Sequence, residues 1–222
     1  GNNGTTLDIL HNGGSEFTTI VSGGATEAFD LDLTIVAGDT VDFIIGNNDN
    51  WGGDRSSLSA TITGTPIDVT DTAETIAQIR DDYLAHTPVA TESSIGKIAD
   101  THGTGAWDFY GSETIGGDLT PLTYEPGGLV GGSQDGYSLV GQTHGFPGLT
   151  PNGFWGPAPP ADGLALHPGM HIHAIDYMVV RWTAGVHSDG TFNIAGAQTV
   201  ENGGNNGTTL DILHNGGSEF KT

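Results

Sequence analysis

The sequence predicts an all-β protein: an antiparallel two-sheet β-sandwich of jelly-roll type, with one short accessory helix and long loops rich in glycine and proline. Apolar and polar residues alternate strictly from Phe29 to Ile35, as in a strand with one buried face. Turn signals such as Asn12–Gly13 separate the short apolar runs. Glycine accounts for 37 of the 222 residues, a content typical of short strands joined by tight turns.

The segments that we expect to form strands are short and rich in β-branched, aromatic and aliphatic residues. They are Thr6–Leu10, Phe17–Val21, Phe29–Ile35, Thr40–Ile45, Leu58–Thr63, Ala106–Gly111, Gly163–His167, Ala174–Thr183, Gly190–Ala195 and Thr208–Leu213. The glycine-rich stretch 127–145 and the proline-rich stretch 147–160 are expected to be long irregular connections.

One helix is expected at roughly residues 72–86. Asp71 and Glu74 have the spacing of a capping box, and Thr87–Pro88 provides a stop signal. Helical spacing connects the apolar residues Ile76, Ile79, Tyr83 and Leu84. We interpret this helix as a boundary element that docks on a neighbouring sheet.

The amino-acid sequence at the beginning of the chain is repeated at its end. Residues 1–17 are identical to residues 204–220, an offset of 203 residues, which is about the size of one domain. The next pair differs, with Thr18 against Lys221, and the following pair agrees. The repeat predicts a 203-residue period within a longer repetitive protein, and the mismatch favours diverged neighbouring copies. A terminus duplicated during cloning is the alternative.

The repeat also predicts a modular organisation. We expect residues 1–64 to be the C-terminal half of one sandwich module, 65–94 a junction, and 95–222 the N-terminal half of the next copy, in which 204–222 repeat 1–19. The two copies of one strand compete for one place in a module, and Thr208–Leu213 is expected to occupy it locally. The candidate assembly residues are Thr6, Leu7, Ile9, Leu10, Thr209, Leu210, Ile212 and Leu213.

The charge is strongly acidic. The chain has 27 acidic and 5 basic residues, a net charge of −22, which disfavours nucleic acid and anionic membranes as partners. There is no cysteine and no apolar stretch long enough to cross a bilayer, so we expect no membrane insertion. This balance suits an extracellular or cell-surface protein stabilised by packing or by divalent cations rather than by disulfides.

Histidines and acidic residues give two candidate metal sites. His171 and His173 project from one face of a strand near His167, and His144 or His102 is a candidate for a further ligand of Zn²⁺ or Cu²⁺. A turn histidine bonded to backbone beside two surface histidines is the alternative. Oxygen donors at Asp49 and Asp54 suit Ca²⁺, with a solvated hairpin loop as the alternative.

The aromatic residues Trp51 and Trp155 are candidates for stacking on a glycan, although aromatic residues of a sandwich usually belong to its core. Arg181 is expected to pair with an aspartate or to cover a sheet face. Neither a Ser-His-Asp order nor a pair of catalytic carboxylates stands out, and we expect no enzymatic activity.

Several motifs occur in an order that resembles a known family. The motifs are Trp107–Gly111, His167–Gly169, Val179–Ala184, Gly190–Gly196, Ile212–Gly216 with its copy Ile9–Gly13, and Ala37–Gly46. In this order they resemble the β-sandwich repeat module of secreted and cell-surface proteins of planctomycete-like and verrucomicrobia-like bacteria that carry exosortase sorting signals. That module is similar to jelly-roll carbohydrate-binding modules. The stretch Met170–Tyr177 and the proline-rich stretch before it depart from the pattern, so no shared site is carried over there.

Together these features predict a structural extracellular repeat whose modules join into a filament, stalk or surface layer by sharing strands, with further copies of itself as partner. A glycan-binding module of an adhesin, with polysaccharide as partner, is the alternative, and a metal-binding enzyme domain is a third.

Overall fold

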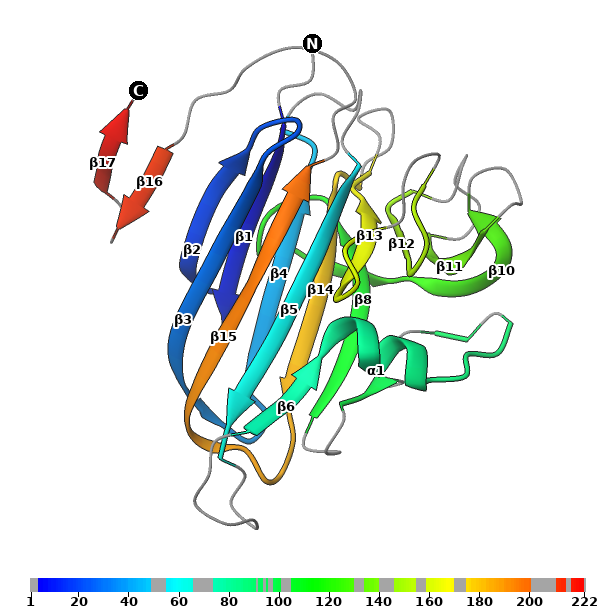
Figure 1. Ribbon diagram of the computed structural model, residues 1–222, viewed down its shortest axis with the longest axis horizontal. Coiled ribbons are helices and arrows are strands. Elements are labelled where there is room, and N and C mark those ends of the chain that lie inside the picture. Colours follow the sequence, from blue (N-terminus) through cyan, green and yellow to red (C-terminus); the bar gives the residue numbers. More distant parts are fainter. Residues whose placement is uncertain are drawn as a thin grey trace.

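Two antiparallel sheets lie face to face in the computed structural model of the chain (Figure 1). The expected all-β two-sheet sandwich with one short helix is therefore confirmed. The residues that the structure describes are 4–48, 55–65, 74–90, 92–93, 95, 98–100, 105–129, 134–139, 146–154, 159–169, 175–200, 211–214 and 217–221.

Seven strands form the first sheet, sheet A: β1 (Thr5–His11), β2 (Gly14–Val21), β4 (Thr40–Gly46), β7 (Ile98–Ala99), β8 (Gly105–Ser112), β9 (Leu119–Pro121) and β14 (Tyr177–Ala184). Their order is β2–β1–β4–β14–β8–β7, and β9 pairs with the end of β8 that β7 does not reach.

Eight strands form the second sheet, sheet B: β3 (Thr26–Val36), β5 (Ser56–Gly64), β6 (Glu74–Gln78), β10 (Thr123–Leu129), β11 (Gln134–Ser138), β12 (Gly148–Thr150), β13 (Gly163–His167) and β15 (Asp189–Val200). Their order is β10–β11–β12–β13–β5–β15–β3, with β6 paired to β5. The short strands β16 (Asp211–His214) and β17 (Gly217–Lys221) form a separate two-stranded sheet.

The pairing of the strands is that of a long hairpin folded on itself. β3 pairs with β15, β4 with β14, β5 with β13 and β8 with β9. Among these eight strands the first thus pairs with the last, the second with the seventh, and so on inward. This nested pairing places four of the strands in each sheet and gives the topology of a jelly roll.

The two sheets combine strands from both parts of the chain. Within sheet A, β4 lies between β1 and β14, and within sheet B, β5 lies between β13 and β15. Residues 1–64 and 95–200, which we expected to belong to successive modules, thus share one sandwich in this chain. The reason is the nested pairing, in which strands from the two ends of the sandwich sequence are direct neighbours.

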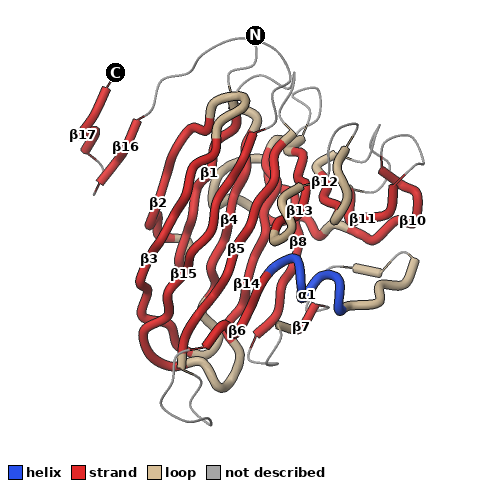
Figure 2. The backbone as a smooth tube through the Cα atoms, in the orientation of Figure 1, coloured by secondary structure: helices blue, strands red, loops and turns tan. Residues whose placement is uncertain are grey.

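Local sequence patterns located most strands. In β3 the side chains of Phe29, Leu33 and Ile35 are buried, Leu31 is half-buried, and the residues between them are exposed, as the alternation predicts. The glycine- and proline-rich region differs from the expectation, because it contains β10, β11 and β12 in addition to loops (Figure 2). β12 pairs with β13, β11 with β12, and β10 with β11, so the three strands extend sheet B beyond β13.

The helix is shorter than expected. Residues 74–78 form strand β6, and α1 spans Ile79–Ala85, with Gln78 as its N-cap. Ile76, Ile79 and Tyr83 are buried as their spacing predicts, but Leu84 is 55 % exposed. The helix belongs to this sandwich, because Asp82 accepts a hydrogen bond from the buried Trp107 side chain at 2.8 Å.

Candidate assembly site

The first copy of the repeated segment is the hairpin β1–β2, which is seated on the edge of β4. β1 pairs with β2 on one side and with β4 on the other, so it is a central strand of sheet A. Asn12 and Gly13 form its tight turn, with φ angles of 49° and 80° that asparagine and glycine tolerate best. A β-bulge between Ile9 and Leu10 interrupts the pairing with β2.

The inner face of the hairpin is part of the main core. Leu7 and Ile9 are completely buried, and a row of aromatic rings leads from the hairpin into the sandwich. The centroids of Phe17 and Phe29 are 6.4 Å apart, and those of Phe29 and Phe43 are 5.6 Å apart. Complete burial of one such aliphatic side chain stabilises a fold by about 1.5–3 kcal/mol, so the hairpin is strongly held in its place. We call this place, along strand β4 from Val41 to Gly46, the seat of the hairpin.

The tip of the hairpin is fixed to the β3–β4 turn by polar contacts. Asn12 donates its backbone N–H to the Thr40 carbonyl and accepts the Thr40 N–H on its side chain, both at 3.0 Å. The Asn12 amide also donates to Asp39 at 2.9 Å, and the His11 ring lies 3.1 Å from the same carboxylate. The backbone N–H of Val36, followed by these two side chains, lowers the pKa of Asp39. These contacts fix the register of β1 against β4.

The outer face of sheet A carries a second, smaller apolar cluster. Leu10, Ile44 and Val179 are buried there side by side on β1, β4 and β14. The β8–β9 loop lies over this cluster, because a methyl group on Gly116 would come within 3.8 Å of the Leu10 side chain. Thr6 accepts the Gly46 N–H at 3.1 Å on the same face.

Asp8 is one of the polar groups that this face buries. It is 4 % exposed and accepts a hydrogen bond from the Thr18 hydroxyl at 2.9 Å on Oδ1. Its other oxygen, Oδ2, is buried and has no hydrogen-bond partner among the described residues. Burial raises the pKa of Asp8 to about 6, an effect that the Thr18 hydrogen bond opposes. The hairpin is therefore seated at the expense of one poorly satisfied carboxyl group.

A neighbouring aspartate on this face is well satisfied. Arg181 donates two hydrogen bonds to Asp42, at 2.6 and 2.8 Å, and its guanidinium lies 5.7 Å from the centre of the Tyr110 ring. The expected pairing of Arg181 with an aspartate is confirmed.

The second copy of the repeated segment folds as the same hairpin. Ile212 faces Phe220 and His214 faces Gly217, with a bulge between Ile212 and Leu213. A shift of 203 residues superposes this register, bulge included, on that of β1–β2. Among the described strands β16 pairs only with β17, although it lies near β2, whereas β1 pairs with both β2 and β4.

The place beside β4 is taken by the first copy. We expected Thr208–Leu213 to occupy it, but Thr5–His11 does so in this chain. Leu7 and Ile9 face the core, while Thr6 and Leu10 lie on the outer face. Of the predicted assembly residues in the second copy, Ile212 and Leu213 lie on β16, and Thr209 and Leu210 lie outside the described residues.

Most predicted ligand-binding residues lie outside the described part of the chain: Trp51, Asp49, Asp54, Trp155, His171 and His173, with His102 and His144. His167 is described and is buried at the end of β13. It stacks on Phe146 at 3.8 Å and bonds the Pro168 carbonyl at 2.6 Å, while burial lowers its pKa to about 4. The described residues contain no group of three His, Asp or Glu side chains placed to hold a metal ion.

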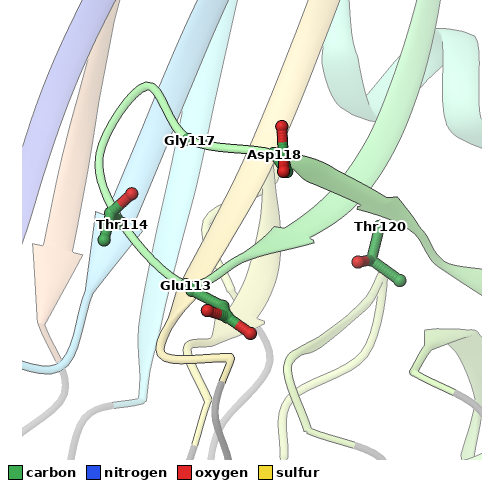
Figure 3. A pocket seen from close by; sticks show the side chains of 5 residues that line it. All are labelled: Glu113, Thr114, Gly117, Asp118 and Thr120. Carbon is green, nitrogen blue, oxygen red and sulfur yellow. The ribbon is translucent and has the colours of Figure 1, made fainter.

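A hollow of about 420 Å³ lies at the β8–β9 loop (Figure 3). Its lining comes from that loop and the start of β9: Glu113, Thr114, Gly117, Asp118 and Thr120. Glu113 and Asp118 are exposed to solvent, and we assign no ligand to this hollow.

Asp8, Asp39 and Asn12 were not among the predicted site residues. The sequence places Asp8 on the polar side of an alternating strand, which predicts exposure rather than burial. The mismatch between Thr18 and Lys221 was the available signal, because it marks the position that faces this carboxyl group.

Comparison of the chain with models of protein families, with curated proteins and with solved structures gave no match. The resemblance to a bacterial surface module therefore stays a prediction. Among the described residues, no helix has the length and apolar character needed to span a membrane.

Proposed function

We propose that this chain is a structural module of an extracellular filament or surface layer, and that its modules join by sharing the repeated hairpin. The observation that carries the proposal is the second hairpin, which repeats the register and bulge of β1–β2 at an offset of 203 residues. Its sequence matches the seat beside β4, because Leu210 and Ile212 correspond to the buried residues Leu7 and Ile9.

Main-chain pairing makes such a junction strong and selective. An inserted β-strand forms a ladder of backbone hydrogen bonds, and alternate side chains enter fixed pockets. It also covers a sheet edge that would otherwise expose unpaired backbone groups. The net charge of −22 supports a module that meets its own copies through a specific seat, since general contact between such surfaces is repulsive.

The test compares the assembly of the full chain with that of a chain ending at residue 203. We expect the full chain to form filaments with an axial repeat of one module under the electron microscope, and the shortened chain to stay monomeric in sedimentation experiments. The variant Leu210→Ser/Ile212→Ser should also stay monomeric at unchanged length. Its matched control is Glu219→Gln, whose counterpart Glu16 is exposed in the first copy.

Two results would contradict the proposal. One is a shortened chain that assembles like the full chain. The other is a full chain that remains monomeric as its concentration approaches the millimolar range, which is the effective concentration at which short flexible linkers hold a tethered segment.

A further inference from the structure

We infer that the second hairpin, residues 211–221, fits the seat beside β4 better than β1–β2 does, and that a second copy of this chain inserts it there. The inference rests on the proposed function. It adds the residue that decides whether the hairpin of a second copy replaces a chain's own hairpin beside β4. Residues 5–19 and 208–222 differ at one position, where Thr18 in the first copy corresponds to Lys221 in the second.

That position faces the buried aspartate of the hairpin. Thr18 pairs with Asp8 in the first hairpin, and Lys221 pairs with Asp211 in the second. Residues directly opposite each other in an antiparallel pair have Cβ atoms about 4.5–5.5 Å apart, within reach of a lysine side chain. The single difference between the copies is thus located opposite a buried carboxyl group with one unsatisfied oxygen.

The Thr18 hydroxyl serves only one of the two carboxylate oxygens of Asp8. Oδ2 is buried without a hydrogen-bond partner among the described residues. A lysine ammonium has three donors and a full charge, so it can serve the second oxygen as well. Thr18 is half-buried at the edge of the face, where a lysine stem can pack while its ammonium group stays hydrated.

The other charged groups around Asp8 do not provide this partner. The guanidinium of Arg181 on β14 is engaged by Asp42 on β4. His11 on β1 is engaged by Asp39. The remaining titratable residues on the neighbouring elements are acids or tyrosines: Glu16 on β2, Tyr177 on β14, Asp108 and Tyr110 on β8, and Glu113 and Asp118 on the β8–β9 loop. Burial is therefore the cause that disfavours a charged Asp8, and a cation at position 18 would oppose it.

The preference of the seat for the lysine hairpin depends on pH. Burial raises the pKa of Asp8 to about 6, and a lysine partner would return it toward the ordinary value of 3.8. If the pKa returned completely, the hairpin with lysine would bind beside β4 roughly a hundredfold more tightly than the hairpin with threonine, since each pKa unit contributes a factor of ten to the ratio of the two binding constants. We therefore expect a ratio of about tenfold to a hundredfold above pH 6, and no preference below about pH 4, where both carboxyl groups are protonated.

This ratio is large enough to allow exchange. A chain's own hairpin has an effective concentration on the order of millimolar. A tenfold to hundredfold preference then allows the hairpin of a second copy to displace it at concentrations of roughly 10–100 μM.

The experiment uses four full chains: wild type, Thr18→Lys, Lys221→Thr, and the exchanged variant Thr18→Lys/Lys221→Thr. The exchanged variant is the matched control, because its composition and net charge equal those of the wild type. At pH 7.5 we expect the association constant measured by analytical ultracentrifugation to fall at least tenfold in Lys221→Thr and in Thr18→Lys, and further in the exchanged variant. At pH 4 the four chains should associate equally.

Equal association constants in all four chains at pH 7.5 would overturn the inference and leave hairpin sharing intact. A wild type that does not associate would contradict the proposed function itself. In that case the urea midpoint of the monomer decides whether lysine fits the seat better. The substitution Thr18→Lys should raise the urea midpoint at pH 7.5 and leave it unchanged at pH 4. An unchanged midpoint at both pH values would overturn the preference for lysine.

Discussion

Arg181 on β14 and Asp42 on β4 form a bidentate ion pair, with donor–acceptor distances of 2.6 and 2.8 Å. The Asp42 side chain is 6 % exposed and that of Arg181 is 27 % exposed. Asp42 pairs with Leu10 and Asp8 pairs with Ile44, so the ion pair lies two register positions from Asp8, on the strand beside which the hairpin is placed.

Removing one partner of this pair should lower the free energy of unfolding more than removing both partners. Arg181→Met leaves the buried Asp42 carboxylate without its cation, and we expect a loss of about 3 kcal/mol in the free energy of unfolding. The double variant Asp42→Leu/Arg181→Met should lose less, because no buried charge remains. Urea denaturation of the single and double variants measures the coupling, and strictly additive losses would contradict the role given to this pair.

The stability of the chain should fall when a cavity is made in β1 and should change little when a side chain on the exposed side of α1 is shortened. Leu7→Ala removes a completely buried side chain, for which we expect a loss of about 2–5 kcal/mol. Leu84→Ala makes the same chemical change at a position that is 55 % exposed, and its effect should stay within about 0.5 kcal/mol. Similar losses in the two variants would place β1 outside the core.

The contribution of Asp8 to the stability of the wild type should fall as the pH rises from about 4 to about 6, whereas the buried, neutral His167, whose pKa is lowered to about 4, contributes in the opposite direction. The pKa of Asp8 is about 6 in the folded chain and near 3.8 when exposed, so between these values the folded state holds a proton that the unfolded state releases. The stability contributed by the protonated group is complete below pH 4 and is lost through pH 6, up to about 3 kcal/mol.

Asp8→Asn should remove this part of the pH dependence, because an amide does not titrate and still offers an oxygen to Thr18. Urea midpoints at pH 4, 5, 6 and 7 for wild type and variant measure the difference. Parallel profiles over this range would show that Asp8 titrates at its ordinary pKa.

Calcium should raise the melting temperature of the chain by several degrees. The net charge of −22 makes the compact state repel itself, and bound divalent cations would relieve this repulsion. Thermal melts with added Ca²⁺ and with chelator test the prediction, with NaCl at matched ionic strength as the control for screening. Identical melts across a range of Ca²⁺ concentrations would contradict it.

The sequence predicted the strands whose signals are local. The alternation of Phe29–Ile35 and the Asn12–Gly13 turn depend on neighbouring residues alone, and both have the expected structure. The Asp71–Glu74 capping pattern was a poor guide, because pairing with β5 draws Glu74–Gln78 into a strand before the helix begins. Strands β10–β12 carry weak local signals and form through pairing alone.

The sequence by itself determined the all-β class, the acidity of the surface, and the repetition of one hairpin with a single substitution. Only the tertiary structure decided that the first copy occupies the place beside β4 and that Asp8 is buried opposite the substituted position. Alternation in a strand tells which residues share a face, whereas the burial of that face depends on elements distant in sequence. Here those elements are β4 and β14, which extend the outer face of β1, and the β8–β9 loop, which lies over Leu10 on that face.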